Sequence, residues 1–188
     1  MQGKYKIFIE ITQNGESFDA IVASGENSSK PHATPTDRKI KERDIITIDM
    51  GCKINGYCSD MTRTIFVGKP TEEQEKIYNI VLENQKRVLN EIREGANIKT
   101  LAKSVESNFN LFGQSLIHSL GHGVGLEIHE APAINGKNDI PLKENMVITD
   151  EPGIYIAGNF GVRIEDTILV TKKGVITLTE SSKECIII

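Results

Sequence analysis

The chain has 188 residues, of which 38% are hydrophobic and 26% charged, and its formal net charge is −4. These values predict one globular domain. No apolar run approaches the roughly 20 residues that a membrane-spanning helix needs. The sequence also has no Lys/Arg cluster of the kind that predicts a nucleic-acid partner. Three cysteines without C-x-x-C spacing and a start that lacks a signal peptide's apolar core favour the reducing cytoplasm.

The first third of the chain predicts strands and loops. A short apolar piece at residues 20–23 precedes a loop rich in Gly, Ser, Pro and Asn that carries His32. "DIITIDMG" (44–51) and "GYCSDMTRTIFVG" (56–68) predict two strands that pair as a hairpin around "CKIN". The alternation of side chains places Asp60, Thr62 and Thr64 on one face of the second strand.

Two helices follow. Thr71 is a good N-cap with Gln74 three residues later, a capping-box pattern, and Gly95 follows the last turn. The apolar residues between them recur at spacings of three and four. A second helix is expected from Thr100 to about Phe112.

The remainder predicts strands joined by glycine loops. "NMVITDEPGIYI" and "GVRIEDTILVT" each have the pattern of one strand, and "GVITLT" that of a shorter one. Strands around two helices predict an α+β domain.

Histidine is concentrated in one short stretch. Three of the four histidines lie in "HSLGHGVGLEIHEAP": His118, His122 and His129. The stretch lacks the Glu of the helical H-E-x-x-H zinc motif, and its glycines match no phosphate-binding loop. Glycines on both sides of His122 allow close approach of the backbone, which suits a metal ligand in a cleft.

Four carboxylates in strand-like contexts could complete a metal site. Asp49 and Asp60 lie 60 − 49 = 11 residues apart on the two arms of the predicted hairpin, and Glu151 stands where Pro152 ends a ladder. Alternation puts Glu165 on the same face as Arg163. Taken singly, each carboxylate fits an ordinary surface residue or a buried salt bridge as well as a ligand.

Four motifs in this order, "IDMGCKINGYCSDMTRT", "HSLGHGVGLEIHEAP", "MVITDEPGIY" and "GVRIEDT", resemble the catalytic domain of Xaa-Pro peptidases. These are prolidase and aminopeptidase P, which share the pita-bread fold with methionine aminopeptidase and creatinase. The resemblance runs from about Ser17 to the last residue. It implies an antiparallel sheet with helices packed on its outer face.

The resemblance also implies roles for individual residues. Five would be metal ligands: Asp49, Asp60, His122, Glu151 and Glu165. Asp60 and Glu165 would bridge two ions, and Glu151 would also handle the proton of the attacking water. His32, His118 and His129 would face the substrate, and Arg163 in "RIED" favours prolidase and aminopeptidase P over methionine aminopeptidase.

The chemistry expected from such a site is hydrolysis of the Xaa-Pro peptide bond by a hydroxide that bridges two divalent ions. An oxygen-rich ligand set favours Mn²⁺, with Co²⁺ or Zn²⁺ also feasible. Without metal, four clustered carboxylates would repel one another and some pKa values would rise. Cys52 and Cys58 are interpreted as packing residues, and Asp150 is expected to point away from the metals.

The chain also departs from the family pattern. The N-terminal domain of full-length relatives is expected to be absent, which leaves residues 1–188 as a single pita-bread domain whose first helix is cut to "YKIFIEITQNG". A proline-containing peptide is the expected substrate, and a homodimer is left open. The alternatives are a methionine aminopeptidase-like enzyme, cleaving without proline preference, and a non-enzymatic module that binds peptides or proteins.

Overall fold

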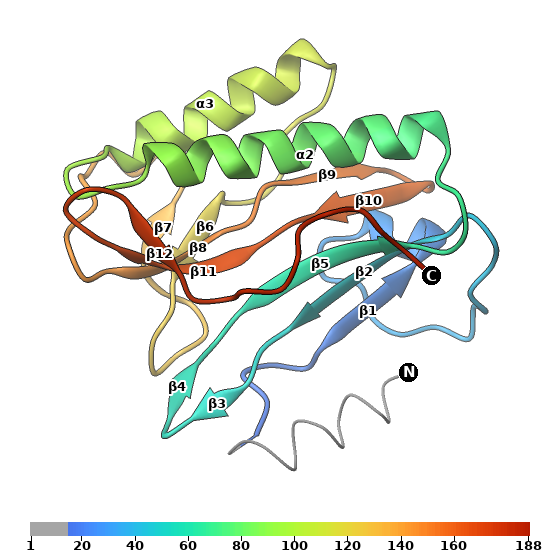
Figure 1. Ribbon diagram of the computed structural model, residues 1–188, viewed down its shortest axis with the longest axis horizontal. Coiled ribbons are helices and arrows are strands. Elements are labelled where there is room, and N and C mark those ends of the chain that lie inside the picture. The colour runs from blue at the N-terminus through green and yellow to red at the C-terminus, as the bar shows by residue number, and fades with distance from the viewer. Residues whose placement is uncertain (1–14) are drawn as a thin grey trace.

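The computed structural model describes residues 15–188 and has two main sheets with two helices lying together on one side (Figure 1). The four-stranded sheet is antiparallel except for its last strand, in the order β1 (Ile21–Ser24), β2 (Ile45–Met50), β5 (Met61–Phe66) and β13 (Ile186–Ile187). The five-stranded sheet has the order β12 (Val175–Thr177), β11 (Asp166–Val170), β8 (Val147–Asp150), β6 (Gly121–Gly123) and β7 (Glu130–Ile134). Among these described residues, no helix has both the length and the apolar character needed to span a membrane.

The predicted hairpin is confirmed. Strands β2 and β5 pair antiparallel with Asp49 opposite Thr62. Between them the chain makes a small second hairpin from β3 (Lys53–Ile54) and β4 (Tyr57–Cys58). Its turn residues Asn55 and Gly56 have φ values of 52° and 87°, as a two-residue turn between twisted strands requires. The hairpin therefore brings the carboxylates of Asp49 and Asp60, which are 60 − 49 = 11 residues apart, to one end of the sheet.

The two long strands predicted in the last third are each broken in the middle. One divides into β8 and β9 (Gly153–Ile156), and the other into β10 (Phe160–Arg163) and β11. Within the part of the chain that the structure describes, β9 and β10 pair only with each other. The breaks fall at Glu151–Pro152 and at Ile164–Glu165, so both glutamates of the predicted site stand where ladder pairing stops. Pro152 explains the first break, since it has no N–H to donate.

The first predicted helix is confirmed as α2 (Glu72–Glu91). Both bonds of the capping box are present: Thr71 Oγ1 accepts from the Gln74 backbone N–H, and Gln74 Oε1 accepts from the Thr71 N–H. The second helix, α3 (Ile98–Leu111), begins two residues before the predicted Thr100. Asn97 is its N-cap, because its side chain accepts a hydrogen bond from the Thr100 N–H.

The core lies between the helices and the sheets. Helix α2 contacts β8, β9 and β10, and α3 contacts β7. Fully buried side chains from both layers meet there; they include Val81, Val88, Val105, Phe109, Ile148, Ile154 and Ile164. The prediction of an α+β domain with helices on the outer face of the sheet is confirmed. The predicted truncated helix falls at residues 5–15, of which 5–14 lie outside the described residues.

Candidate metal centre

The five predicted ligands come from five separate places in the fold and line one cavity of about 620 Å³. Asp49 lies on β2, Asp60 directly precedes β5, and His122 is the middle residue of β6. Glu151 and Glu165 occupy the two strand breaks. Both sheets and the β9–β10 pair therefore contribute, which explains why the ligands are scattered over more than a hundred positions of sequence.

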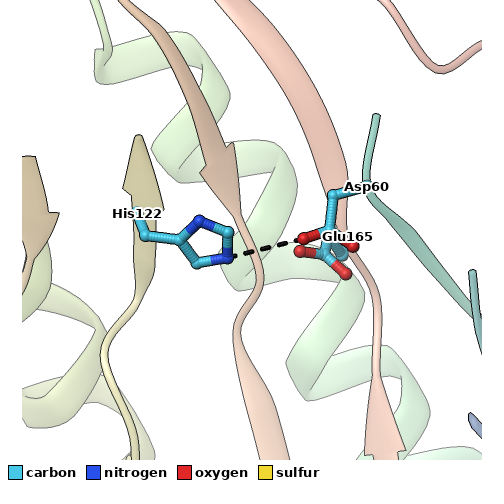
Figure 2. Close-up of side chains that lie close together, drawn as sticks. All are labelled: Asp60, His122 and Glu165. Carbon is cyan, nitrogen blue, oxygen red and sulfur yellow. Dashed lines mark ion pairs between the residues drawn. The ribbon is translucent and has the colours of Figure 1, made fainter. Parts of the chain in front are cut away.

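Asp60, His122 and Glu165 form the tightest group, with one ligand atom of each lying within 4.8 Å of the others (Figure 2). His122 Nε2 lies 3.5 Å from Asp60 Oδ2 and 3.4 Å from Glu151 Oε1. Its other ring nitrogen, Nδ1, lies 3.0 Å from the carbonyl of Gly123. A proton on Nδ1 leaves the Nε2 lone pair directed at the carboxylates, which is the tautomer of a metal ligand. Burial lowers the pKa of His122, which keeps the ring neutral as ligation requires.

The glycines beside His122 are required by close packing. A Cβ on Gly121 would clash with the backbone of Thr149, and one on Gly123 would clash with the backbone of Ala131. Strand β6 therefore packs closely between β8 and β7. This close packing fixes how far the His122 imidazole reaches into the cavity.

Asp49 has one oxygen engaged and one oxygen without a partner. Oδ2 accepts a hydrogen bond of 2.6 Å from Arg163 Nη2. Oδ1 is buried and has no hydrogen-bond partner among the described residues. A buried carboxylate oxygen without a partner is costly, and a cation in the cavity would remove that cost.

Two threonine hydroxyls orient the glutamates. Thr62 Oγ1 donates to Glu165 Oε2 at 2.6 Å, and Thr149 Oγ1 donates to Glu151 Oε1 at 3.2 Å. Thr62 was placed on the Asp60 face by strand alternation, but its bond to Glu165 was not predicted. Hydrogen bonds of this kind hold carboxylates in the orientation that a metal ion needs.

The carboxylates repel one another, as expected for a cluster with no cation. Burial, followed by the charges of Asp49 and Glu151, raises the pKa of Asp60 to about 8. Burial is also the main cause that raises the pKa of Glu151 to about 7, and it raises that of Glu165 well above its usual range. Four carboxylates and one neutral imidazole fit hard or borderline divalent cations.

His118 belongs to a hydrogen-bonded chain that ends at Asp49. Its Nδ1 lies 2.7 Å from the Ser119 carbonyl, and its Nε2 lies 3.0 Å from the hydroxyl of Tyr155. Tyr155 in turn accepts a hydrogen bond of 2.8 Å from Arg163 Nη1. Tyr155 was missed in the sequence, although alternation from Glu151 through Gly153 to Tyr155 places it on the face of the site. Burial lowers the pKa of His118 to about 4, so the ring is neutral.

The other two histidines are exposed residues that line the same cavity. The His129 ring stands edge-on to His122, with 4.3 Å between ring centroids. All four histidines of the chain therefore surround one cavity, with His32 entering from the loop after β1.

Three residues near the ligands in sequence do not line this cavity. Cys52 Sγ lies 3.4 Å from Ser59 Oγ, and Cys58 Sγ donates to the Leu126 carbonyl. Asp150 is 1% exposed and pairs in register with Asp166 on β11, away from the ligands. Burial raises the pKa of the Asp150 carboxyl well above its usual range.

Comparisons with known proteins agree with this geometry. Residues 2–172 match the model of metallopeptidase family M24. A Xaa-Pro dipeptidase of Pyrococcus furiosus is 49% identical over 171 residues, which are 89% of this chain and 49% of that protein. The structure of a Xaa-Pro dipeptidase from Bacillus anthracis superposes with a TM-score of 0.95 at 43% identity, covering 99% of this chain and 53% of that one.

An X-Pro aminopeptidase from Thermotoga maritima is also similar in structure, with a TM-score of 0.90 at 39% identity over 95% of this chain and 51% of that one. Pita-bread enzymes of both specificities thus share this architecture. The chain spans about half the length of the relatives that it matches.

Proposed function

We propose, from the premise that this chain belongs to metallopeptidase family M24, that it hydrolyses the peptide bond that precedes proline in Xaa-Pro peptides. The observation that carries the proposal is the convergence of Asp49, Asp60, His122, Glu151 and Glu165 on one cavity. The buried, unpartnered Oδ1 of Asp49 and the raised pKa values of its neighbours support a cation there.

The same five residues, Asp60 and Glu165 among them, would hold two divalent ions. Bound divalent ions acidify a water molecule and polarise the carbonyl of the substrate. The donor set favours Mn²⁺, and Co²⁺ or Zn²⁺ are compatible with it. Four ionised carboxylates balance the charge of two divalent ions, so the loaded site is close to neutral.

The residues of the chain itself would orient the reactants and move the proton. Glu151 accepts the proton of the attacking water, and its Oε1 lies 3.4 Å from His122 Nε2, next to the ligand cluster. His118 and His129 contact the scissile peptide and the developing oxyanion. His32 completes the substrate side of the cavity, and Arg163 holds Asp49 through the bond of 2.6 Å.

A pocket for proline needs apolar walls and no acceptor that requires an N–H from the substrate. The cavity has apolar lining beside its ligands, contributed by Phe18, Ile21, Pro31, Ile128 and Ala133. The relatives named above act on Xaa-Pro or X-Pro peptides, according to their descriptions. These features support the choice of proline substrates for this chain.

A substrate panel tests the proposal. The metal-free protein would be given Mn²⁺ and then Ala-Pro, Ala-Pro-Ala and Met-Ala-Ser, with EDTA as the control. Release of alanine from either proline peptide supports the proposal, and the preferred length distinguishes a dipeptidase from an aminopeptidase. Cleavage of Met-Ala-Ser alone would identify a methionine aminopeptidase-like enzyme instead. Absence of both turnover and Mn²⁺ binding would favour a non-enzymatic binding module.

A further inference from the structure

A buried arginine outside the cavity holds the backbone of one ligand. Arg63 is the third residue of β5, and its side chain points away from the carboxylates although it is only 5% exposed. It does not line the cavity. A guanidinium buried to this degree must find partners for its N–H groups, because unpaired buried charge is costly.

All five N–H groups of Arg63 have acceptors. Nη1 donates to the carbonyls of Thr62, at 2.9 Å, and of Glu165, at 2.5 Å. Nη2 donates to Asp166 Oδ1 at 2.7 Å. The two remaining bonds run to the carbonyls of Ser181 and Ser182, at 2.8 and 3.1 Å. A planar fork with five donors is the one side chain that can satisfy such a set.

Glu165 needs this support because it lies in a break between two strands. No ladder pairing holds Ile164 or Glu165. The N–H of Glu165 donates to the Thr62 carbonyl at 3.1 Å, and its own carbonyl accepts from Arg63. Its carboxylate accepts from the Thr62 hydroxyl. These three hydrogen bonds of Glu165 therefore all involve Thr62 and Arg63, two adjacent residues of β5.

Residues 181–188, which we call the strap, contact Arg63 through the carbonyls of Ser181 and Ser182. Lys183 Nζ pairs with Asp166 Oδ2, and its carbonyl accepts from the Tyr78 hydroxyl of α2. Beyond it, β13 pairs in parallel with β5. The strap thus supplies two of the five acceptors of Arg63 and fastens itself to the strand that carries Arg63.

We propose that Arg63 is a positioning residue that fixes Glu165 in the geometry for metal binding, and that the strap holds Arg63 in place. The inference rests on the proposed metal centre. Arg63 touches neither the substrate nor the ions and acts through the backbone of Glu165. Loss of the strap would leave Arg63 with two unpaired N–H groups, and the carbonyl of Glu165 would be free to move.

Arg63→Lys keeps the positive charge but has three donors and no planar fork. Supporting residues around metal ligands typically change metal affinity by about 10- to 100-fold. We expect Arg63→Lys to lower the affinity of the metal-free protein for Co²⁺ by this factor and to alter the visible absorption bands of the bound Co²⁺. Arg87→Lys is the matched control, because Arg87 is another hydrogen-bonded arginine whose three partners are side chains on α2 and α3, away from the ligands.

Two truncations test the strap. A chain that ends at Glu180 loses both serine carbonyls, and we expect it to bind Co²⁺ as weakly as Arg63→Lys. A chain that ends at Cys185 loses only β13 and should stay near the wild type. Circular dichroism would confirm folding, and the truncations decide the question if Arg63→Lys does not fold.

Wild-type Co²⁺ affinity and spectrum in Arg63→Lys would overturn the inference. If Arg63→Lys does not fold, the same result in the chain ending at Glu180 would overturn it. A wild-type chain that binds no Co²⁺ would instead overturn the proposed function.

Discussion

Arg163 and Asp49 form a buried ion pair in which one oxygen of the carboxylate is held and the other has no hydrogen-bond partner within residues 15–188. The bond between Arg163 Nη2 and Asp49 Oδ2 is 2.6 Å long, and the side chains are 4% and 12% exposed. The pair orients Asp49 so that Oδ1 remains for a cation. Removal of the arginine would leave a buried charge without compensation.

We therefore expect Arg163→Met to lower the free energy of unfolding of the metal-free protein by about 3–5 kcal/mol. Urea denaturation at pH 7 would measure it. Arg87→Met is the control, because it removes a partly exposed pair with Glu91 and should cost less than about 1 kcal/mol. A change of equal size in both variants would show that Asp49 does not depend on Arg163.

In the proposed metal centre, Asp60 would contribute to function at the expense of stability. Burial and the charges of Asp49 and Glu151 raise its pKa, so its ionised form is unfavourable in the metal-free protein. Asp60→Asn should raise the midpoint of thermal unfolding at pH 8 without metal. Loss of a residue that supports a metal ligand lowers metal affinity or activity by up to about 100-fold. Loss of Asp60, a proposed ligand itself, should therefore lower kcat/KM by more than about 100-fold. Unchanged turnover at saturating Mn²⁺ would remove Asp60 from the site. The control Asp139→Asn, at an exposed ion pair with Lys99, should change neither quantity.

The raised pKa values also set a pH dependence of stability. The pKa values of Asp60 and Glu151, about 8 and about 7, exceed the value of about 4 in the unfolded chain. The folded state therefore binds more protons, and the stability that these groups contribute falls as the pH rises from about 4 to 8.

We expect the urea midpoint of the metal-free protein to decrease between pH 5.5 and 8.5. Saturating Mn²⁺ should remove most of this decrease, because the ions favour the ionised carboxylates. The double variant Asp60→Asn, Glu151→Gln should show a flatter dependence without metal. A midpoint that rises with pH in the metal-free wild type would contradict the assignment.

Local signals in the sequence predicted most of the fold. The capping box at Thr71 and the hairpin that joins Asp49 to Asp60 depend on residues close in sequence, and both are confirmed. Pro152 predicted the end of ladder pairing at Glu151. The break at Glu165 was not predicted, because the apolar alternation continues across it. The start of α3 was placed late because the Asn97 cap was overlooked.

The parts of the candidate site that lie within sequence motifs could be predicted. The residues that hold those parts in place through contacts between distant sequence positions could not. The five proposed ligands were identified from motifs that resemble those of a known family, and all five line one cavity. Tyr155 had a local signal, its alternation with Glu151. Arg63 had none: its acceptors at residues 165, 166, 181 and 182 lie more than 100 positions away, and only the folded sheet brings them together.

His129 provides a test of the division between ligands and substrate contacts. Its ring packs edge-on against His122 but belongs to an exposed residue, whereas the ligands are buried or half-buried. His129→Ala should lower kcat by about 100-fold, a magnitude typical of a positioned proton donor. Mn²⁺ content, measured by atomic absorption, should not change. Loss of the ions would instead make His129 a ligand.

The Tyr155 hydroxyl connects Arg163 to His118. The role of this hydroxyl can be tested with Tyr155→Phe, which removes only its oxygen. Burial raises its pKa to about 12, so the hydroxyl stays protonated and donates to His118 Nε2 while it accepts from Arg163. Tyr155→Phe removes one hydrogen bond from the orientation of His118. If the lost hydrogen bond contributes about 1–1.5 kcal/mol to the transition state, kcat/KM should be about tenfold lower. Mn²⁺ affinity should be unchanged, and Tyr57→Phe on the exposed hairpin should match the wild type. Weaker Mn²⁺ binding at unchanged kcat would show that Tyr155 acts on the ligands through Arg163 rather than on His118.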